Sequence, residues 1–317
     1  MKRILIIGST GQIGSELSIK LRSIYGKDNV ICGYYKPPYP NGFFDWGPTV
    51  EIDATKVEQI IEPVKKYKID TIFNLAAILS AVAEDKPKLG WDVCMGALIN
   101  CLNVAKEYNC AVFTPSSIGS FGLNTPKDNT PQDTIQRPQT IYGITKVAGE
   151  LLSDYYFNRW GVDTRSIRFP GLISNLTPPG GGTTDYAVDI FYKAVAEEKF
   201  YCPIKKGTFM DMMYMPDALS AMIQLMEADA SKLVHRNSFN VTAMSFDPEI
   251  IYGAIKKHYP SFEMEYKVDP LRQSIADSWP NSLDDSCARE EWGWHPKFDL
   301  ETMTKDMIEV LKRRKMG

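Results

Sequence analysis

The sequence predicts an α/β fold, with a doubly wound parallel sheet and a smaller C-terminal lobe. Short, continuous apolar runs recur through the first half of the chain and alternate with helical patterns. Glycines cluster directly after the first of these runs. After residue 171 the alternation gives way to an irregular stretch rich in glycine and proline. The 317 residues, 44% of them hydrophobic, are enough to bury a large core with such a lobe attached.

The first expected strand is the apolar run Arg3-Ile-Leu-Ile-Ile7, whose pattern is typical of a parallel strand buried on both faces. The turn Gly8-Ser-Thr-Gly11-Gln-Ile-Gly14 follows, and a helical pattern opens at Ser15. This arrangement indicates a Rossmann-like dinucleotide site, because missing side chains let a pyrophosphate approach a helix N-terminus. Glycines that serve packing alone are the alternative. The expected cofactor residues in this turn are Gly8, Thr10, Gly11, Gln12, Ile13 and Gly14.

The second expected strand, residues 29–34, lacks the acidic residue that would bind the adenosine ribose of NAD at its end. Tyr34 and Lys36 lie in that region, so the choice between NAD and NADP stays open. Lys36 is interpreted as a loop lysine, with a contact to a 2′-phosphate as the alternative. Asp53 either bonds an adenine amine, beside Ala54, or caps the helix expected to start there.

Two further buried strands are expected at residues 70–75 and 110–114. Ligands of doubly wound sheets bind beyond the carboxyl ends of the strands. The small residues Ala76 and Ala77 at the first of these ends allow a cofactor to pass over the strand. The side chains expected at these ends are Leu75, Ser80, Ser116 and Ser117.

The segment Ile141-Tyr-Gly-Ile-Thr-Lys146 carries the expected chemistry. Tyr142 and Lys146 are four residues apart and therefore share one helix face. The lysine ammonium favours the phenolate, which makes Tyr142 the candidate general base for a substrate hydroxyl. The same spacing occurs at Tyr201 and Tyr252, so the pair gains its meaning from the preceding serine and glycine turn.

Taken in order, the glycine turn, Ser117 and Tyr142-x-x-x-Lys146 resemble the extended short-chain dehydrogenase/reductase family. The resemblance implies that Ser117, Tyr142 and Lys146 are catalytic and that Ser116 contacts the cofactor. It also implies that the segment after the sixth strand, a strand expected at about 164–167, runs beside the nicotinamide. The residues concerned are Phe169, Pro170 and Leu172. Cys94 stands where many relatives carry an asparagine, and we expect it to be a buried small hydrophobe.

Beyond Gly171, the segment Pro-Gly-Gly-Gly-Thr-Thr-Asp-Tyr-Ala187 and Asp277-Ser-Trp-Pro280 are similar to short-chain L-threonine 3-dehydrogenases. This resemblance implies NAD-dependent oxidation of L-threonine at C3 to 2-amino-3-oxobutanoate. The glycine loop has two alternative interpretations. It is either a gate over the substrate or a linker with a helix cap, supplied by residue 183, 184 or 185. The implied substrate residues are Ser80, Ser117, Tyr142, Gly182, Thr183, Thr184 and Trp279.

Composition excludes several classes of function. A net charge of −3 gives no basic field for nucleic acid or anionic lipid. Six cysteines without a CxxC pair and three histidines argue against a bound metal or a disulfide framework. The first residues lead directly into a strand, so we expect a cytoplasmic enzyme, or a mitochondrial one if a transit peptide precedes this sequence.

The nucleotide-binding domain is expected at residues 1–170 with a returning segment 208–241, the substrate lobe at 171–203 and 243–297, and a C-terminal helix at 298–317. The family resemblance implies a homodimer. Its expected helical interface, which equally fits a core face, comprises Leu98, Ile99, Leu102, Val147, Leu151 and Leu152. Alternative functions are a nucleotide-sugar epimerase, dehydratase or reductase, and a non-catalytic dinucleotide sensor.

Overall fold

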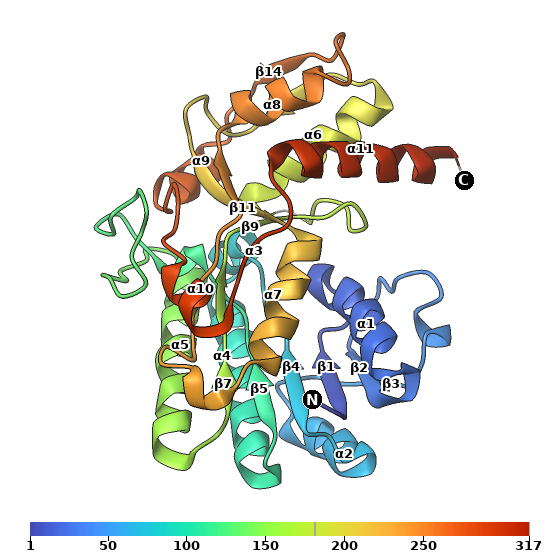
Figure 1. The fold of residues 1–317 in the computed structure, drawn as a ribbon, viewed down its shortest axis with the longest axis vertical. Helices are drawn as coiled ribbons and strands as arrows, with labels where there is room; N and C mark the ends of the chain where they lie inside the picture. The colour runs from blue at the N-terminus through green and yellow to red at the C-terminus, as the bar shows by residue number, and fades with distance from the viewer. Residues whose placement is uncertain (181, 317) are drawn as a thin grey trace.

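The computed structural model describes residues 1–180 and 182–316. Its central feature is a six-stranded sheet in the order β3-β2-β1-β4-β5-β7, in which all neighbouring strands are parallel (Figure 1). The predicted doubly wound α/β fold is therefore confirmed. The strands of this sheet are β1 (Ile4–Ile7), β2 (Val30–Tyr34), β3 (Thr49–Glu51), β4 (Thr71–Asn74), β5 (Ala111–Phe113) and β7 (Thr164–Arg165).

Helices cover both faces of this sheet because its central strands are apolar on both sides. Ile4 and Ile6 of β1 pack in one hydrophobic cluster, with side chains of α1 and α7, whereas Leu5 and Ile7 pack in the other. This division follows from the alternation of side chains along a strand. The helices on the two faces are α1 (Gln12–Tyr25) and α7 (Met215–Glu227), and α2 (Val57–Tyr67), α4 (Pro87–Tyr108) and α5 (Ile141–Trp160).

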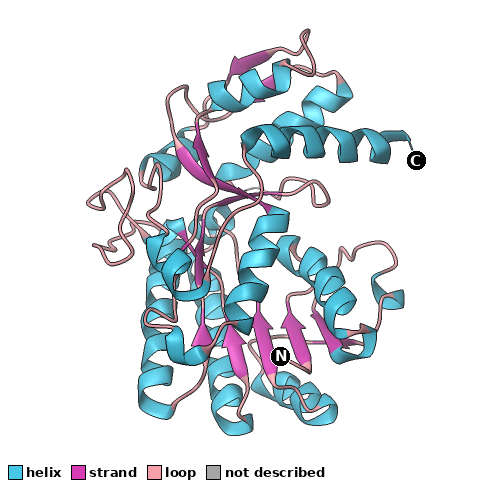
Figure 2. Ribbon diagram, in the orientation of Figure 1, coloured by secondary structure: helices cyan, strands magenta, loops and turns pink. Residues whose placement is uncertain are grey.

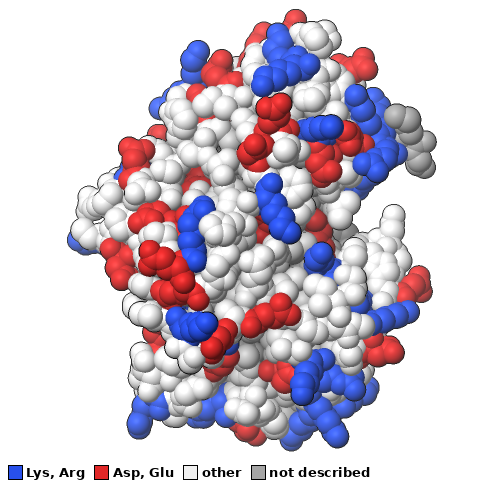
Figure 3. Space-filling model, in the orientation of Figure 1, with Lys and Arg blue, Asp and Glu red and all other residues white. Residues whose placement is uncertain are grey.

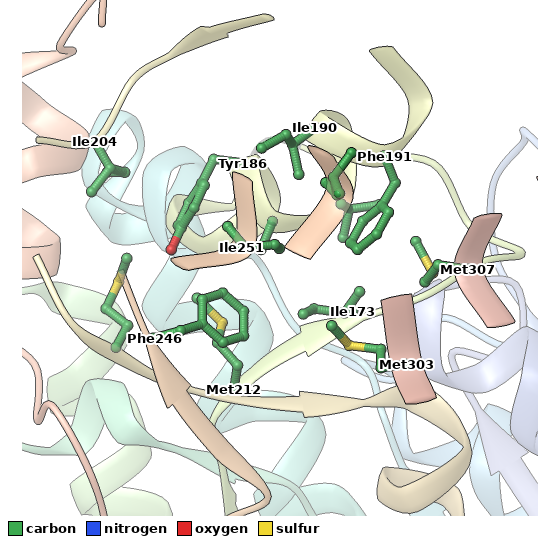
Figure 4. Close-up of a cluster of buried hydrophobic side chains, with 14 of the residues drawn as sticks. Ile173, Tyr186, Ile190, Phe191, Ile204, Met212, Phe246, Ile251, Met303 and Met307 are labelled. Atoms are coloured by element: carbon green, nitrogen blue, oxygen red, sulfur yellow. The ribbon is translucent and has the colours of Figure 1, made fainter. Parts of the chain in front are cut away.

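A second hydrophobic core lies above the sheet in the view of Figures 1 and 2, and Figure 4 shows its side chains. It is built on a three-stranded sheet, β13-β11-β9, and on the pair of β10 and β14. The strands are β9 (Gly171–Ile173), β10 (Phe200–Cys202), β11 (Met210–Tyr214), β13 (Met244–Phe246) and β14 (Met264–Tyr266). The helices are α6 (Tyr186–Ala196), α8 (Pro248–Lys256), α9 (Pro270–Asp277) and α11 (Leu300–Met316).

Short elements join the two cores. A small parallel sheet, β12-β8-β6, carries the serines expected at the active site. Its strands are β6 (Ser116–Ser117), β8 (Ile167–Phe169) and β12 (Phe239–Asn240). The remaining elements used below are α3 (Ser80–Asp85), α10 (Ser286–Trp292) and the 3-10 turns η3 (Ile118–Ser120), η4 (Thr183–Asp185) and η5 (Ala230–Lys232).

Three local expectations were wrong. The first helix begins at Gln12 rather than at Ser15, because Gly11 already serves as its N-cap. The sixth strand is broken at Ser166, whose side chain and amide bond to residues 238 and 236, so that β7 joins the main sheet and β8 the small one. Asp53 caps no helix, since α2 begins only at Val57, and its carboxylate accepts hydrogen bonds from Thr55.

The segment expected to return to the main sheet pairs elsewhere. Its strand β11 lies between β9 and β13. Met212 packs in the second core, whereas Met213 packs in the cluster that contains Ile4 and Ile6. Helix α11 packs on the second core through Met303 and Met307, whereas Gly317 lies outside the described residues. The division into a cofactor domain and a substrate lobe stays a prediction.

Figure 3 shows acidic and basic side chains interspersed over the visible face. Within residues 1–180 and 182–316, no helix is both long and apolar enough to span a bilayer.

Candidate active site

A cavity of about 360 Å³ lies where the glycine turn, the β6 strand, the start of α5 and the η4 turn meet. It unites residues from the two cores that are far apart in sequence. The predicted residues that line it are Gly8, Gly11, Gln12, Ile13, Gly14, Leu75, Ala77, Ser80, Ser116, Ser117, Tyr142, Lys146, Phe169, Pro170, Leu172, Gly182, Thr183, Thr184 and Trp279.

The glycine turn at one end of the cavity forms a cradle for a phosphate group. Gly8 has a φ of +81°, and a Cβ at Gly14 would lie 2.2 Å from the carbonyl oxygen of Gly8, so side chains are excluded at both positions. Gly11 caps α1 without any side-chain hydrogen bond. The first amides of α1 therefore remain available to an anion, which fits the pyrophosphate of a dinucleotide.

The start of α5 is fixed firmly, and this places Tyr142 at the cavity. The Thr140 side chain accepts a hydrogen bond from the Gly143 amide at 3.0 Å, and Glu84 of α3 accepts one from the Ile141 amide at 2.7 Å. Lys146 lies with its Nζ 5.2 Å from the Tyr142 ring centroid and donates to the carbonyl oxygen of Pro115 at 2.8 Å. The ammonium is thus held beside the phenol, as the shared helix face predicts.

Ser117 approaches Tyr142 across the η3 turn. Its Oγ accepts a hydrogen bond from the Gly119 amide at 3.1 Å, which orients the hydroxyl. A Cβ at Gly119 would lie 3.1 Å from Cε1 of Tyr142, so the phenol ring packs directly on this backbone. The serine, tyrosine and lysine thus line the same cavity.

A buried ion pair supports this wall from behind. Arg168 donates to both carboxylate oxygens of Glu150, at 3.0 and 2.9 Å, and both side chains are nearly inaccessible to solvent. The same carboxylate accepts hydrogen bonds from Ser116 and from Gln136. Because Glu150 lies on α5 and Ser116 on β6, this network ties the strand that carries Ser117 to the helix that carries Tyr142.

A smaller cavity of about 30 Å³ is lined by Lys146, Asn74 and Thr114, among others. Asn74 Oδ1 and Thr114 Oγ1 are buried without a hydrogen-bond partner among the described residues. Cys94 lines it as well and is half-buried, which corrects the expectation of a fully buried position. All six cysteines are free thiols.

The cavity is also lined by Ser80 of α3, by the threonines of η4 and by Trp279, which follows α9. Ser80 and Trp279 are buried, and the buried Oγ1 of Thr183 has no hydrogen-bond partner in the described part of the chain. The expected capping of α6 by Thr183 or Thr184 does not occur, because both lie within η4. Asp185 holds the N-cap position, yet its carboxylate accepts from the amides of glycines 180 and 182; Gly181 lies outside the described residues.

Four predicted cofactor residues do not line the large cavity: Thr10, Asp53, Ala54 and Ala76. Ala76 lines the smaller one. Asp53 follows the edge strand β3, and hydrogen bonding by the Thr55 hydroxyl holds the pKa of the Asp53 carboxyl below its usual value. Near this edge, Tyr34 packs edge-on against the rings of Tyr39 and Phe43.

Sequence reasoning missed some of the lining. The residues it did not select are Leu79, Pro115, Ile118, Gly171 and Asp185. Each neighbours a selected residue, so extending the strand ends by one position would have found most of them. Gly171 is constrained for a separate reason, since a Cβ there would lie 2.4 Å from the Met212 sulfur and 2.7 Å from Cγ2 of Thr184.

Comparison with protein families finds a match to the NAD dependent epimerase/dehydratase family over residues 4–242. A Staphylococcus saprophyticus protein, named as an uncharacterized epimerase/dehydratase, is 55% identical over 312 residues, which cover 98% of each chain.

Two solved structures are similar over the full length. L-threonine dehydrogenase from Clostridium difficile is 57% identical, with a TM-score of 0.98 over 100% of this chain and 99% of that one. The holo form of a GalE-like L-threonine dehydrogenase from Cupriavidus necator is 46% identical, with a TM-score of 0.95 over 98% and 100% of the two chains. The resemblance to extended short-chain dehydrogenases/reductases is therefore confirmed, and a nicotinamide dinucleotide is the cofactor that this family implies.

Proposed function

The chain belongs to the NAD-dependent epimerase/dehydratase family, and from this premise we propose that it oxidises L-threonine at C3 to 2-amino-3-oxobutanoate. One observation carries the proposal: Ser117, Tyr142 and Lys146 line the same cavity as Ser80, Thr183 and Thr184. A base for a secondary alcohol therefore faces a set of hydroxyls suited to a small polar substrate. The similarity to two proteins named as L-threonine dehydrogenases supports the same substrate.

Tyr142 removes the proton of the C3 hydroxyl in this proposal. The ammonium of Lys146 stabilises the phenolate electrostatically, and the Ser117 hydroxyl orients the substrate oxygen by hydrogen bonding. A bound nicotinamide cofactor would supply the hydride acceptor for C3. The glycine turn would hold its pyrophosphate, and the residues that would hold the nicotinamide end are Phe169, Pro170 and Leu172, which line the cavity.

The polar end of the cavity selects the amino acid. The buried Thr183 hydroxyl has no hydrogen-bond partner within residues 1–180 and 182–316, and it is available to the amino or carboxylate group of the substrate. Thr184 and Ser80 add hydroxyls beside it, and the Trp279 indole provides an apolar wall. Gly182 precedes η4 and allows the loop to lie close to the substrate.

We propose NAD as the cofactor in preference to NADP. Lys36 places its ammonium 4.6 Å from the Tyr35 ring centroid, so the nearest expected partner of a 2′-phosphate is engaged with an aromatic ring. Asp53 remains the proposed partner of the adenine at the edge of the sheet.

The test measures reduction of NAD and of NADP with L-threonine, L-allo-threonine, L-serine and a panel of nucleotide sugars. We expect turnover with L-threonine and NAD, and little with the other amino acids. Activity on a nucleotide sugar, with none on amino acids, would contradict the substrate and leave the fold and catalytic residues intact. Dinucleotide binding without any turnover would indicate the sensor function instead.

We also propose a homodimer that uses the outer faces of α4 and α5. Of the expected interface residues, Leu98 and Leu102 are buried in the core, whereas Ile99 and Leu151 are exposed and available to a partner. Light scattering of the purified protein measures the mass directly, and a monomeric mass at micromolar concentration would contradict this arrangement.

A further inference from the structure

We propose that His235, Cys287 and Asp133 form a binding site for a soft divalent cation such as Zn²⁺, separate from the active-site cavity. These residues come from three segments: the loop after η5, helix α10 and the loop that precedes α5. His235 Nε2 lies 3.9 Å from Cys287 Sγ and 3.5 Å from an oxygen of Asp133. None of the three is among the residues that line the 360 Å³ cavity.

These separations fit metal coordination better than direct hydrogen bonding. Zinc bonds of about 2.3 Å to sulfur and 2.0–2.1 Å to nitrogen or oxygen, at tetrahedral angles, place neighbouring ligand atoms about 3.4–3.6 Å apart. The two separations from His235 Nε2, 3.9 Å to Cys287 and 3.5 Å to Asp133, lie within a few tenths of an ångström of that spacing. The exposed Asp133 carboxylate then closes on Cys287 when the ion binds. Thiol, imidazole and carboxylate together are a ligand set that favours zinc.

Glu291 prepares the histidine for this role. One of its carboxylate oxygens bonds to Nδ1 of His235, and the other accepts from the amides of Val234 and His235 at 2.6 and 3.1 Å. A carboxylate on Nδ1 fixes the proton there and leaves the Nε2 lone pair directed at Cys287 and Asp133. This carboxylate–histidine arrangement is the usual support of a metal-bound imidazole.

Access and charge also suit a cation. Cys287 is half-buried, the His235 side chain is 25% exposed and the Asp133 side chain 87% exposed, so an ion can enter and the carboxylate can adjust. Cys287 and Glu291 are four residues apart and therefore lie on one face of α10. Burial, together with the nearby carboxylates of Glu291, Asp284, Glu290 and Asp133, raises the pKa of the Cys287 thiol, so the surroundings of the sulfur carry negative charge.

A bound ion would add a direct link between the loop after η5, helix α10 and the loop that precedes α5. Asp133 follows the buried Gln132, whose carbonyl oxygen accepts from Arg168 of the active-site ion pair at 2.7 Å. Metal binding is therefore expected to stabilise the folded protein by mass action and to raise its melting temperature by several degrees.

The experiment titrates tag-free, reduced protein with Co²⁺, whose thiolate charge-transfer absorption reports a cobalt–sulfur bond. We expect one equivalent to bind, with Zn²⁺ displacing it. Cys287→Ser should abolish the charge-transfer band, His235→Gln should weaken binding at least tenfold, and Glu291→Gln should weaken it about 10–100-fold. Cys94→Ser, which changes the other half-buried cysteine, should retain the band.

A second measurement on the unaltered protein guards against variants that fail to fold. Mass spectrometry follows alkylation of each cysteine, and Zn²⁺ should slow the modification of Cys287 specifically. Absence of any cobalt–thiolate band at saturating Co²⁺, a band that survives in Cys287→Ser, or unchanged alkylation of Cys287 would each overturn the proposal.

Discussion

Replacing Gly143 with alanine tests whether the contact between α5 and η3 positions the catalytic tyrosine. A Cβ at this position would lie 2.2 Å from the carbonyl oxygen of Gly119 and 2.5 Å from Cβ of Pro138. Real Cβ contacts are essentially never closer than 3.0 Å, so the helix start must move by about 0.8 Å. A displacement near 1 Å at a catalytic group costs about 100-fold in rate.

The expected stability change is small in comparison. Alanine gains about 1 kcal/mol in helix propensity, and overpacking costs about 1–3 kcal/mol, so the net loss is at most about 2 kcal/mol. The assay measures kcat and KM for the substrate that the panel identifies, together with urea unfolding. The matched control is Gly253→Ala in α8, where an added Cβ meets no atom within 4 Å. Gly143→Ala with kcat within threefold of the parent protein would refute the reasoning.

Three further variants test other parts of the account. Tyr142→Phe should lower kcat by about 10²–10⁴-fold and leave cofactor affinity intact. The control Tyr252→Phe, which loses one hydrogen bond to the Phe262 carbonyl oxygen, should keep full activity. Equal effects of the two variants would contradict the assignment of Tyr142 as the base. Glu150→Gln should cost about 3–5 kcal/mol in urea unfolding, because it leaves the Arg168 charge buried without its partner; a loss below 1 kcal/mol would show that the pair is dispensable. Burial raises the pKa of Asp211 well above its usual value, so the folded state keeps a proton that the unfolded state releases, and stability falls as pH rises above about 4. Asp211→Asn should remove that part of the pH dependence between pH 4 and 7, and a slope equal to that of the parent protein would contradict it.

The main sheet could be predicted because its signals are local. The run at residues 3–7 is apolar after Arg3, and the run at 70–75 is centred on Ile72 and Phe73. Both form strands of that sheet within a residue or two of the expected ends. The prediction of a continuous sixth strand was wrong for a nonlocal reason. Ser166 bonds to residues 236 and 238, and no local sequence pattern indicates these partners. Strand β11 reads as a core strand from its methionines, yet only tertiary pairing decides which sheet receives it.

The site shows the same division between local and nonlocal information. Tyr142 and Lys146 were accessible to sequence reasoning because helix geometry alone places them together. Asp53 and Thr10 do not line the large cavity. Their roles were expected only from their positions after a strand, and such a position does not determine which side chains reach the cavity. Glu150 was not selected at all, because its meaning depends on Arg168 and Ser116, which join it only in the folded chain.

The family resemblance implies that an asparagine at position 94 would steady the active-site backbone, and other groups hold that backbone here. Cys94 can donate only weakly, and the thiol lies at the small cavity beside Lys146. The ammonium of Lys146 is held instead by the Pro115 carbonyl oxygen, one residue before Ser116, whose hydroxyl bonds to Glu150. Two bonds therefore join α5 to the segment of residues 115–116, one to the Pro115 carbonyl oxygen and one to the Ser116 hydroxyl, and Ser117 follows directly. Neither bond involves the Cys94 side chain of α4.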